Sequence, residues 1–369
     1  MKLSLLGIIL SLVWLLALPQ YARADWKQDW EKTVAAAEKE GEVVLYGQGR
    51  VGVSDAIREF QKGYPKIRLN FVSGQGSELA KKIMAEKRAD KHLVDVAVGG
   101  GGTMVLVYHK AGLLEKMSSA FILPEVNNAA LWWSKKHHYA DPDQSRVFMA
   151  QGDLDDRIGA YNKNLLKPAE IHSWWDVLDP KWKGRIVMSD PKWAGNIGSW
   201  RYLYYAPELG PKFIKRFLEE AAPVFSTDER QMIDWLAGGK YAMYLLAKDE
   251  NIEQAVKQGL PIDTLRAQKD GGSITTGSGH ISFFQKPPHP NAARVYINWF
   301  LSRDGQLAWQ KYTLGNSLRT DIPKDMLPGG RTQVPKEGRS YMMTSLPQYE
   351  DVKPLRSLVD EVLSKRPVK

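Results

Sequence analysis

The sequence predicts an α/β protein built on mainly parallel sheets. Short apolar segments alternate with segments of helical spacing over residues 26–110. Several apolar segments end in glycine-rich loops, and a helical pattern follows each loop. The chain has 369 residues, which at this length favours two domains. Repeated strand–loop–helix units of this kind imply right-handed crossovers between parallel strands.

The first part of the chain shows the clearest order of elements. Residues 26–39 are rich in Ala, Glu and Lys, as in a helix, and Gly41 ends this pattern. Ser54 stands where it would cap the next helix. After the first helix we expect strands over 43–46, 67–72 and 93–100, and helices over 53–64, 78–88 and 103–110.

The remaining chain repeats the theme with weaker signals. A continuous strand is expected over Ser273–Gln285, which is rich in β-branched and aromatic residues. A long amphipathic helical stretch follows over 289–312, and the tail ends in a helix over 351–365. Other strands are expected over 157–161, 185–188 and 240–247, and other helices from Ser173, over 195–205, 228–236 and 251–258.

The chain begins with the features of a secretory signal peptide. Lys2 is positive, residues 3–18 are almost wholly apolar, and Ala22-Arg23-Ala24 has the small-x-small form that signal peptidase cuts. The apolar run is short for the ~20 residues that a membrane-spanning helix needs, which disfavours an uncleaved anchor. We expect cleavage after Ala24 and export of the mature protein to the periplasm.

Composition narrows the classes of function. The chain has no cysteine, so disulfides and thiol chemistry are excluded. Its net charge is +9, but charges of both signs are mixed without a long basic run, which argues against nucleic-acid binding. A mildly positive surface would favour anionic ligands. The run from His137 to Asp143 matches no zinc or calcium pattern, so we expect no metal and no cofactor.

The stretch "VVLYGQGRVG" has the form of a dinucleotide-binding fingerprint, because a strand runs into Gly47-x-Gly49-x-x-Gly52. A dinucleotide site also needs an acidic residue at the end of the second strand to bind the ribose. Here that strand ends in Val72-Ser73, without Asp or Glu. The glycines then indicate either a tight turn or the close approach of another ligand to the backbone.

The same device recurs along the chain. A glycine-containing loop that leads into a helix presents free backbone N–H groups and partial positive charge to a ligand. Such loops are Gly47–Ser54, Ser73–Ser77, Gly99–Thr103 and Trp193–Ser199. The first three follow parallel strands at the edge where open sheets bind ligands. We expect these loops to converge from two domains on one small polar or anionic molecule.

The order of several segments resembles the periplasmic solute-binding proteins of ABC importers, in the class with two crossovers between lobes that includes ferric-ion-binding proteins. The resemblance covers roughly Trp26 to Ile322 and fades in the tail. The segments are "AAAEKEGEVVLYG", "FVSGQGSELAKKI", "DVAVGGGGT", "IGAYNKNLL", "SWWDVLDPKWKGRIVMSDP", "GSGHISFFQKPPHPNAARVYINWFLSRDGQ" and "NSLRTDI".

The resemblance implies a two-lobed periplasmic-binding-protein fold of type II, with mixed, mainly parallel sheets and a ligand cleft between the lobes. Lobe 1 would comprise 25–155 and 278–325, lobe 2 would comprise 156–277, and 326–369 would form a tail. Hinge closure would hold the solute, and the permease of an ABC importer would recognise the closed form. The implied protein is a monomer that binds a small molecule and is not an enzyme.

The resemblance also bears on the solute. Ferric-binding relatives hold the metal with adjacent tyrosines just after the segment that here reads "AGGKYAMYLLAKDEN", where this chain has Ala247-Lys248-Asp249-Glu250. The pair Tyr204-Tyr205 lies in an expected helix, where neighbours point about 100° apart. An organic anion is therefore the favoured solute, and ferric iron is the alternative. A second alternative is an exported enzyme on the same scaffold, although no nucleophile with its acid or base is evident.

The residues expected to bind the solute come mainly from the glycine loops. Arg319 is included because its planar fork binds carboxylate or phosphate in two places. The full set is Gln48, Gly49, Arg50, Ser73, Gln75, Gly76, Ser77, Gly101, Thr103, Tyr161, Trp193, Asn196, Ser199, Tyr244 and Arg319. Each of these residues also has a purely structural alternative. In that alternative Ser54, Ser77 and Thr103 only cap helices, Trp193 packs against neighbouring side chains, Arg50 is a solvated loop residue, and Arg319 forms a surface ion pair with Asp321.

Overall fold

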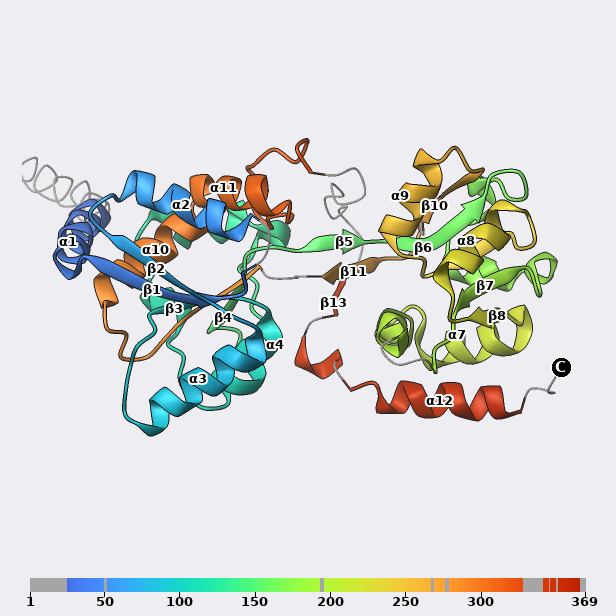
Figure 1. The fold of residues 1–369 in the computed structure, drawn as a ribbon, viewed down its shortest axis with the longest axis horizontal. Coiled ribbons are helices and arrows are strands. Elements are labelled where there is room, and N and C mark those ends of the chain that lie inside the picture. Colours follow the sequence, from blue (N-terminus) through green and yellow to red (C-terminus); the bar gives the residue numbers. More distant parts are fainter. Residues whose placement is uncertain are drawn as a thin grey trace, which may run out of the picture. The chain divides into compact units, whose positions relative to one another are not determined.

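The computed structural model describes residues 25–49, 52–192, 196–266, 269–275, 279–327, 341–344, 346–349 and 351–365. The expected signal peptide lies outside these ranges. The chain divides into two compact units (Figure 1). Unit 1 comprises Met1–Gln151 and Ser278–Met326, and unit 2 comprises Gly152–Gly277 and Leu327–Lys369. None of the helices within the described ranges combines the length and apolar character needed to cross a bilayer.

Unit 1 contains the alternating elements that the sequence predicts for its first part. Its elements are α1 (Asp25–Glu40), β1 (Glu42–Gly47), α2 (Val53–Gly63), β2 (Arg68–Ser73), α3 (Gly76–Arg88), β3 (Val96–Gly99), α4 (Gly101–Thr103), α5 (Pro124–Asn127), β4 (Val147–Met149), β12 (His280–Phe283), α10 (Pro290–Leu301) and α11 (Arg303–Thr313). A π-helix over Met104–His109 continues α4. Three-residue 3-10 turns lie at Met117–Ser119, Ala129–Leu131 and Trp133–Lys135.

The sheet of unit 1 has the strand order β2-β1-β3-β12-β4. Strand β1 runs parallel to β2 and β3, whereas β12 is antiparallel to both β3 and β4. The carboxyl ends of β1, β2 and β3 therefore lie at one edge of the sheet. Helices α2, α10 and α11 lie on one side of the strands and α3 on the other (Figure 1).

The core of unit 1 is formed where helices of both chain segments meet. Helix α2 buries Val53, Ala56, Ile57 and Phe60, the i, i+3, i+4, i+7 spacing of one helical face. The ring of Phe60 packs edge-on against Tyr296 of α10, with centroids 5.2 Å apart. Residues more than two hundred positions apart in sequence thus complete one core.

Unit 2 contains two sheets and shorter helices. Its elements are β5 (Asp153–Asp155), β6 (Arg157–Asn162), β7 (Ile186–Ser189), α6 (Arg201–Tyr205), α7 (Gly210–Arg216), β8 (Val224–Ser226), α8 (Glu229–Ala237), β9 (Met243–Leu245), α9 (Asp249–Lys257), β10 (Ile262–Arg266), β11 (Gly272–Thr275), β13 (Tyr341–Met343) and α12 (Lys353–Ser364). A π-helix covers Phe217–Ala221, and 3-10 turns cover Pro168–Glu170, Trp174–Leu178, Pro180–Trp182, Asn196–Trp200 and Pro347–Tyr349.

The larger sheet of unit 2 has the order β10-β6-β9-β7-β8 and is mixed, since β9, β7 and β8 are parallel while β6 is antiparallel to β9 and β10. Alternate residues of β7 enter different cores. Ile186 and Met188 pack in the cluster that includes Trp174 and Phe213, whereas Val187 packs in the cluster of Met232 and other residues on the other face. This period of two is the expected geometry of a strand buried on both sides.

One expectation about the later chain is wrong. The apolar run Ser273–Gln285 is not one strand: β11 pairs with β5 and β13 in unit 2, and β12 pairs with β3 and β4 in unit 1. The β-forming composition is continuous, but the pairing partners differ between the two ends of the run. The tail ends in the helix α12, which together with β13 belongs to unit 2.

The predicted fold class is confirmed: each unit is a mixed sheet flanked by helices. The expected helix at Ser173 is a 3-10 turn over Trp174–Leu178, and the Ser173 side chain accepts a hydrogen bond from the Trp175 backbone N–H. The helix expected over 195–205 is a 3-10 turn followed by α6. Local sequence propensity thus predicted where these helical turns occur, but not whether they are α-helical or 3-10.

Candidate functional site

The glycine loops of unit 1 meet at the carboxyl edge of its parallel strands. A Cβ atom built on Gly76 would lie 2.5 Å from Thr103 Oγ1 and 3.8 Å from Gln48 Nε2. A Cβ on Gly49 would likewise collide with the hydroxyl of Ser73. The structure therefore brings these five residues together from three loops, and glycine is required because the loops approach so closely.

Three further predicted residues lie at the same edge with different surroundings. Gln75 is the N-cap of α3, and its backbone N–H donates to Glu78 Oε2 at 3.0 Å. Ser77 is exposed in the first turn of α3. Gly101 is buried, and a Cβ there would lie 2.6 Å from Nε2 of His280. Gly101 therefore serves packing.

The capping alternative for the serine and threonine hydroxyls is wrong. Helices α2, α3 and α4 begin at Val53, Gly76 and Gly101, after N-cap residues Gly52, Gln75 and Gly100. Ser54, Ser77 and Thr103 thus lie inside the helices that they were expected to cap. The glycine-rich turns let each helix start earlier than the hydroxyls suggest.

The glycines of the dinucleotide-like motif have structural explanations. A Cβ on Gly47 would collide with the carbonyl oxygen of Val98 on the neighbouring strand. Gly52 has φ 81°, and a Cβ there would collide with the carbonyl oxygen of Tyr312. Strand packing and a left-handed turn thus account for the motif without a nucleotide.

The hollow beneath these loops is small. Gln48, Gly76 and Thr103 line it together with Tyr108 and other apolar residues, and its volume is about 20 Å³. This is room for about one water molecule. Burial raises the pKa of Tyr108, so its phenol stays neutral. Among the described residues of unit 1, this hollow is therefore too small to enclose an organic molecule.

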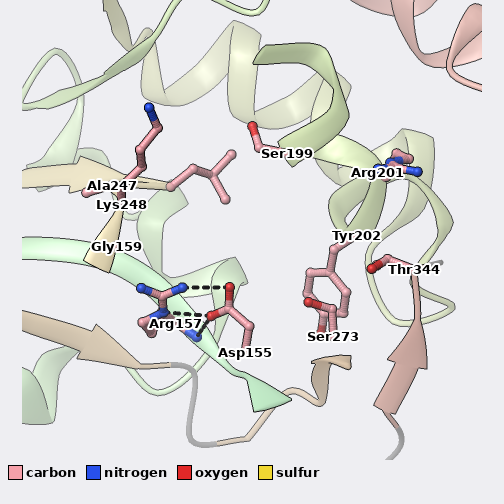
Figure 2. A pocket seen from close by; sticks show the side chains of 11 residues that line it. Asp155, Arg157, Gly159, Ser199, Arg201, Tyr202, Ala247, Lys248, Ser273 and Thr344 are labelled. Carbon is pink, nitrogen blue, oxygen red and sulfur yellow. Dashed lines mark hydrogen bonds and ion pairs between the residues drawn. The ribbon is translucent and has the colours of Figure 1, made fainter. Parts of the chain in front are cut away.

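Unit 2 holds a much larger pocket, with a volume of about 360 Å³. This volume lies in the range of small-molecule sites. In Figure 2 the pair Asp155–Arg157 lies on one side of the pocket and Ser199 on the other. The lining residues are Asp155, Arg157, Gly159, Ser199, Arg201, Tyr202, Leu246, Ala247, Lys248, Ser273 and Thr344.

The charged lining of this pocket is mostly cationic. Arg157 binds Asp155 through two hydrogen bonds, Nε to Oδ1 and Nη2 to Oδ2, each 2.8 Å long. The Lys248 ammonium lies 2.6 Å from Glu229 of α8. With Arg201 the described lining residues carry three cationic side chains and one carboxylate. Two of these cations are paired, Arg157 with Asp155 and Lys248 with Glu229.

Tyr202 supplies the pocket with a neutral phenol. Its hydroxyl donates a hydrogen bond of 2.9 Å to Glu208 Oε1. Burial, reinforced by the Glu208 charge, raises the pKa of Tyr202. Because the phenol is held protonated, it can hydrogen-bond a solute but is poorly suited to act as a phenolate ligand.

Three predicted site residues are buried elsewhere, and these predictions are corrected. Tyr161 is 5% exposed and Tyr244 is 1% exposed, and both pack in the cores of unit 2. Strand alternation points their rings into the layers between sheet and helices. Ser189 and Tyr244 share a hydrogen bond of 3.3 Å.

Arg319 is the third correction, because it is 1% exposed inside unit 1. Its guanidinium donates to Asp321 Oδ1 at 2.9 Å and Oδ2 at 2.7 Å, and to the Leu301 carbonyl oxygen at 2.9 Å. Glu125 lies 3.2 Å from Nη2. The sequence predicted an ion pair of Arg319 with Asp321 as an alternative, but at the surface. In the structure the Arg319 guanidinium is buried, and its N–H groups are occupied inside unit 1.

Of the remaining predicted residues, Ser199 lines the pocket of unit 2. Arg50 and Trp193 lie outside the described residues, and for Asn196 only the backbone, at the start of a 3-10 turn, is described. The pocket-lining residues that were not predicted from the sequence include Arg157, Arg201, Lys248, Ser273 and Thr344. No local sequence pattern marks Thr344.

One group of metal-type ligands occurs among the described residues: His109, Asp141 and Asp143, with ligand atoms within 4.8 Å of one another. Asp141 already accepts hydrogen bonds from the backbone N–H groups of residues 145, 146 and 147. His109 Nε2 lies 2.9 Å from Asp143 Oδ2, and Arg146 approaches the same oxygen. The guanidinium opposes a cation, so the group is better explained as loop structure.

The two α/β units, the polar strand edge of the first and the cationic pocket of the second define a solute-binding protein rather than a nucleotide-binding one. The comparison with families gives the same class. Residues 50–313 match the model of the bacterial extracellular solute-binding proteins, which is more than half of the chain. The chain belongs to this family.

Solved structures with the same fold include proteins that bind iron. Iron-bound HitA from Pseudomonas aeruginosa is 18% identical with a TM-score of 0.52, over 87% of this chain and 99% of that one. Trichodesmium IdiA (FutA), solved with iron and citrate, is 19% identical with a TM-score of 0.57, over 87% and 99%. Mannheimia haemolytica ferric iron-binding protein A in an open conformation is 14% identical with a TM-score of 0.58, over 88% and 98%. These likenesses show the fold.

Proposed function

We propose that the protein captures a small organic anion, such as a carboxylate, phosphonate or sugar phosphate, and delivers it to the permease of an ABC importer. The observation that carries the choice of an anion is the lining of the unit 2 pocket. Arg157, Arg201 and Lys248 line a pocket of about 360 Å³, and the described lining residues include a single carboxylate, that of Asp155. Ser199 and Ser273 add hydroxyls for oriented hydrogen bonds.

The Asp155–Arg157 pair supports recognition of a planar or tetrahedral anion. The two hydrogen bonds to Asp155 fix the guanidinium in one orientation before any solute arrives. Because Asp155 occupies the Nε and Nη2 edge of the guanidinium, a solute anion would meet the remaining N–H hydrogens and the charge of a group that is already held in place. Asp155 and Glu229 compensate part of the positive charge of Arg157 and Lys248, and an anion would compensate the remainder.

We propose that unit 1 also contacts the solute. Gln48, Ser73 and Thr103 present side chains next to the N-terminus of α3, whose backbone N–H groups favour an anion. The test is affinity: Thr103→Ala should weaken binding of the co-purified solute.

The proposal includes export and function as a monomer. Residues 1–24 have the form of a signal peptide, and the family is extracellular. Mass spectrometry of the protein from a periplasmic extract should give a chain that begins at Asp25. A mass that includes Met1 would contradict cleavage, and light scattering would report the oligomeric state.

Ferric iron is the competing solute within the same fold. Among the described residues that line the pocket, Tyr202 is the single tyrosine, and Glu208 holds its phenol protonated. Tyr205 donates its hydroxyl hydrogen to the Asp351 carbonyl oxygen at 2.5 Å. A pair of iron-binding phenolates is therefore not assembled here. A charge-transfer absorption band on addition of ferric iron would reverse this choice.

Native mass spectrometry of protein purified without refolding tests the proposal most directly, because it weighs any molecule that co-purifies. We expect one organic anion per chain, released chemically unchanged, and no binding after Arg157→Met. The exposed Arg216 provides the matched control, since Arg216→Met removes an equal charge outside the pocket. A bound cation or neutral sugar would contradict the proposal, and a converted product would favour an enzyme.

A further inference from the structure

The C-terminal segment of the chain completes a sheet beside the pocket. Strand β13 pairs in parallel with β11, with Met342 opposite Ser273 and Met343 opposite Ile274. On its other side β11 pairs with β5. Without β13, this edge of β11 would leave backbone N–H and C=O groups unpaired. Because Ser273 lines the pocket, β13 supports a pocket wall directly.

The residue after this strand reaches the pocket itself. Thr344 follows Met343 and belongs to the pocket lining, on the side where Tyr202 and Ser273 lie (Figure 2). Its side chain is half-buried, and it brings a hydroxyl and a methyl group to a wall otherwise built from residues 155–273. A residue from the last tenth of the chain therefore contributes to the pocket.

The terminal helix supports the opposite wall. Helix α12 buries Leu355, Val359 and Val362 in the core of unit 2 and packs against the turn Asn196–Trp200, which carries Ser199. The Tyr205 hydroxyl donates to the Asp351 carbonyl oxygen just before α12. The segment is thus fixed to unit 2 by strand pairing, apolar packing and a hydrogen bond.

The family match ends at residue 313, so this segment lies beyond the part of the chain that matches the family model. We infer that residues 341–344, 346–349 and 351–365 form a specificity-determining wall of the pocket, with Thr344 facing the solute. The inference rests on the proposed function for the nature of the solute. Because the segment adds to a pocket that the family core begins, it restricts the size and the charge of the anion accepted.

A chemical probe tests the position of Thr344 without knowledge of the solute. The chain has no cysteine, so Thr344→Cys introduces the single thiol. We measure the ratio of its rate with a sulfonate-bearing methanethiosulfonate to its rate with the trimethylammonium analogue. This ratio should be about tenfold higher than that of a small free thiol, because a cationic pocket concentrates anions. The exposed Gln348 of the same segment provides the control Gln348→Cys, for which the ratio should be close to that of the free thiol.

A second experiment measures binding. Inorganic phosphate and citrate serve as probes in calorimetric titrations of the full mature chain. Thr344→Glu should weaken binding at least tenfold, because it places a carboxylate in the anion pocket. Gln348→Glu adds the same charge to the same segment and should change affinity less than twofold.

The outcomes separate the two proposals. Equal rate ratios at both thiols, or unchanged affinity in Thr344→Glu, would overturn the assignment of the segment to the pocket wall. If the unaltered protein binds neither phosphate nor citrate, the anion proposal is contradicted for these chemical types. The thiol ratio would then still decide whether Thr344 faces a cationic pocket.

Discussion

Arg157 and Asp155 stand two residues apart where the chain enters unit 2, and they form a bidentate ion pair with both hydrogen bonds 2.8 Å long. The Arg157 backbone N–H also donates to Asp155 Oδ1, at 3.2 Å. The Arg157 side chain is 17% exposed. The carboxylate thereby determines where the guanidinium meets a solute, and the geometry of the pair can be tested separately from its charge.

Replacement of Arg157 by lysine keeps the charge and removes the fork. We expect Arg157→Lys to weaken binding of the co-purified solute about tenfold, equal to about 1.4 kcal/mol, because an ammonium cannot engage Asp155 and an oxyanion with fixed geometry. Calorimetry measures the change. Arg216→Lys serves as the control, and equal affinity in the Arg157 variant would show that charge alone is recognised.

The contact of Gly76 with Thr103 predicts a coupled pair of mutations. Gly76→Ala places a methyl group 2.5 Å from Thr103 Oγ1, so we expect it to lower the free energy of unfolding by about 1 kcal/mol. In a Thr103→Ala background the nearest remaining Thr103 atom is Cβ at 3.5 Å, an ordinary contact. There the alanine should stabilise the first turn of α3 by about 0.5 kcal/mol.

Urea unfolding is measured for the unaltered protein, Gly76→Ala, Thr103→Ala and the double variant. The four free energies of unfolding give the coupling energy between positions 76 and 103. A coupling below about 0.3 kcal/mol would mean that the loops do not approach as closely as described. Solute affinity measured on the same proteins shows whether the Thr103 hydroxyl also binds the solute.

The buried Arg319 predicts a loss of stability without loss of affinity. Arg319→Met leaves the Asp321 carboxylate without its partner, and we expect the free energy of unfolding to fall by about 3 kcal/mol. At a temperature where the variant is folded, one equivalent of solute should still bind with unchanged affinity. Unaltered stability with lost binding would restore Arg319 as a ligand residue.

His280 predicts a dependence of stability on pH. Burial lowers its pKa to about 4, from an ordinary value near 6.5. The folded protein therefore keeps the imidazole neutral, and its stabilising contribution is fully present above pH 6.5 and is lost as the pH falls toward 4. The full shift corresponds to about 3 kcal/mol.

Unfolding in urea between pH 7.5 and 4.5 isolates this contribution when His280→Asn is compared with the unaltered protein. The difference between the two proteins should shrink as the pH falls through this window. The exposed His92 provides the control His92→Asn, which should follow the unaltered protein at every pH. Parallel curves for His280→Asn would contradict the burial of a neutral imidazole.

The elements of unit 1 were predictable because their signals are local. The periodicity over 26–110 gives α1 to α4 and β1 to β3 within a few residues, and parallel connections place the strand ends together. The convergence of Gln48, Ser73 and Thr103 follows from that rule. The recurrent glycine loops predicted that these residues meet at one edge of the sheet, because a close approach between backbones requires glycine.

The unit 2 pocket was largely unpredictable because its residues come from segments joined by tertiary contacts. Thr344 meets Ser273 through pairing of β13 with β11, which no local pattern specifies. The burial of Arg319 was not predicted, because a charged side chain is usually exposed to solvent. The carboxylates of Asp321 and Glu125 compensate its charge inside the protein. The run Ser273–Gln285 reads as one strand since propensity does not record a change of partner.

Neither unit is a continuous stretch of chain, and this constrains the order in which the protein acquires its structure. Unit 1 needs α10 and α11, and unit 2 needs β13 and α12 from the final residues. Pairings of such long sequence separation form slowly and only after loop closure. A nascent chain that lacks its last segment can therefore complete at most one of the two units. In a family of extracellular proteins, whose members must cross a membrane, a chain that folds late stays threadable for longer.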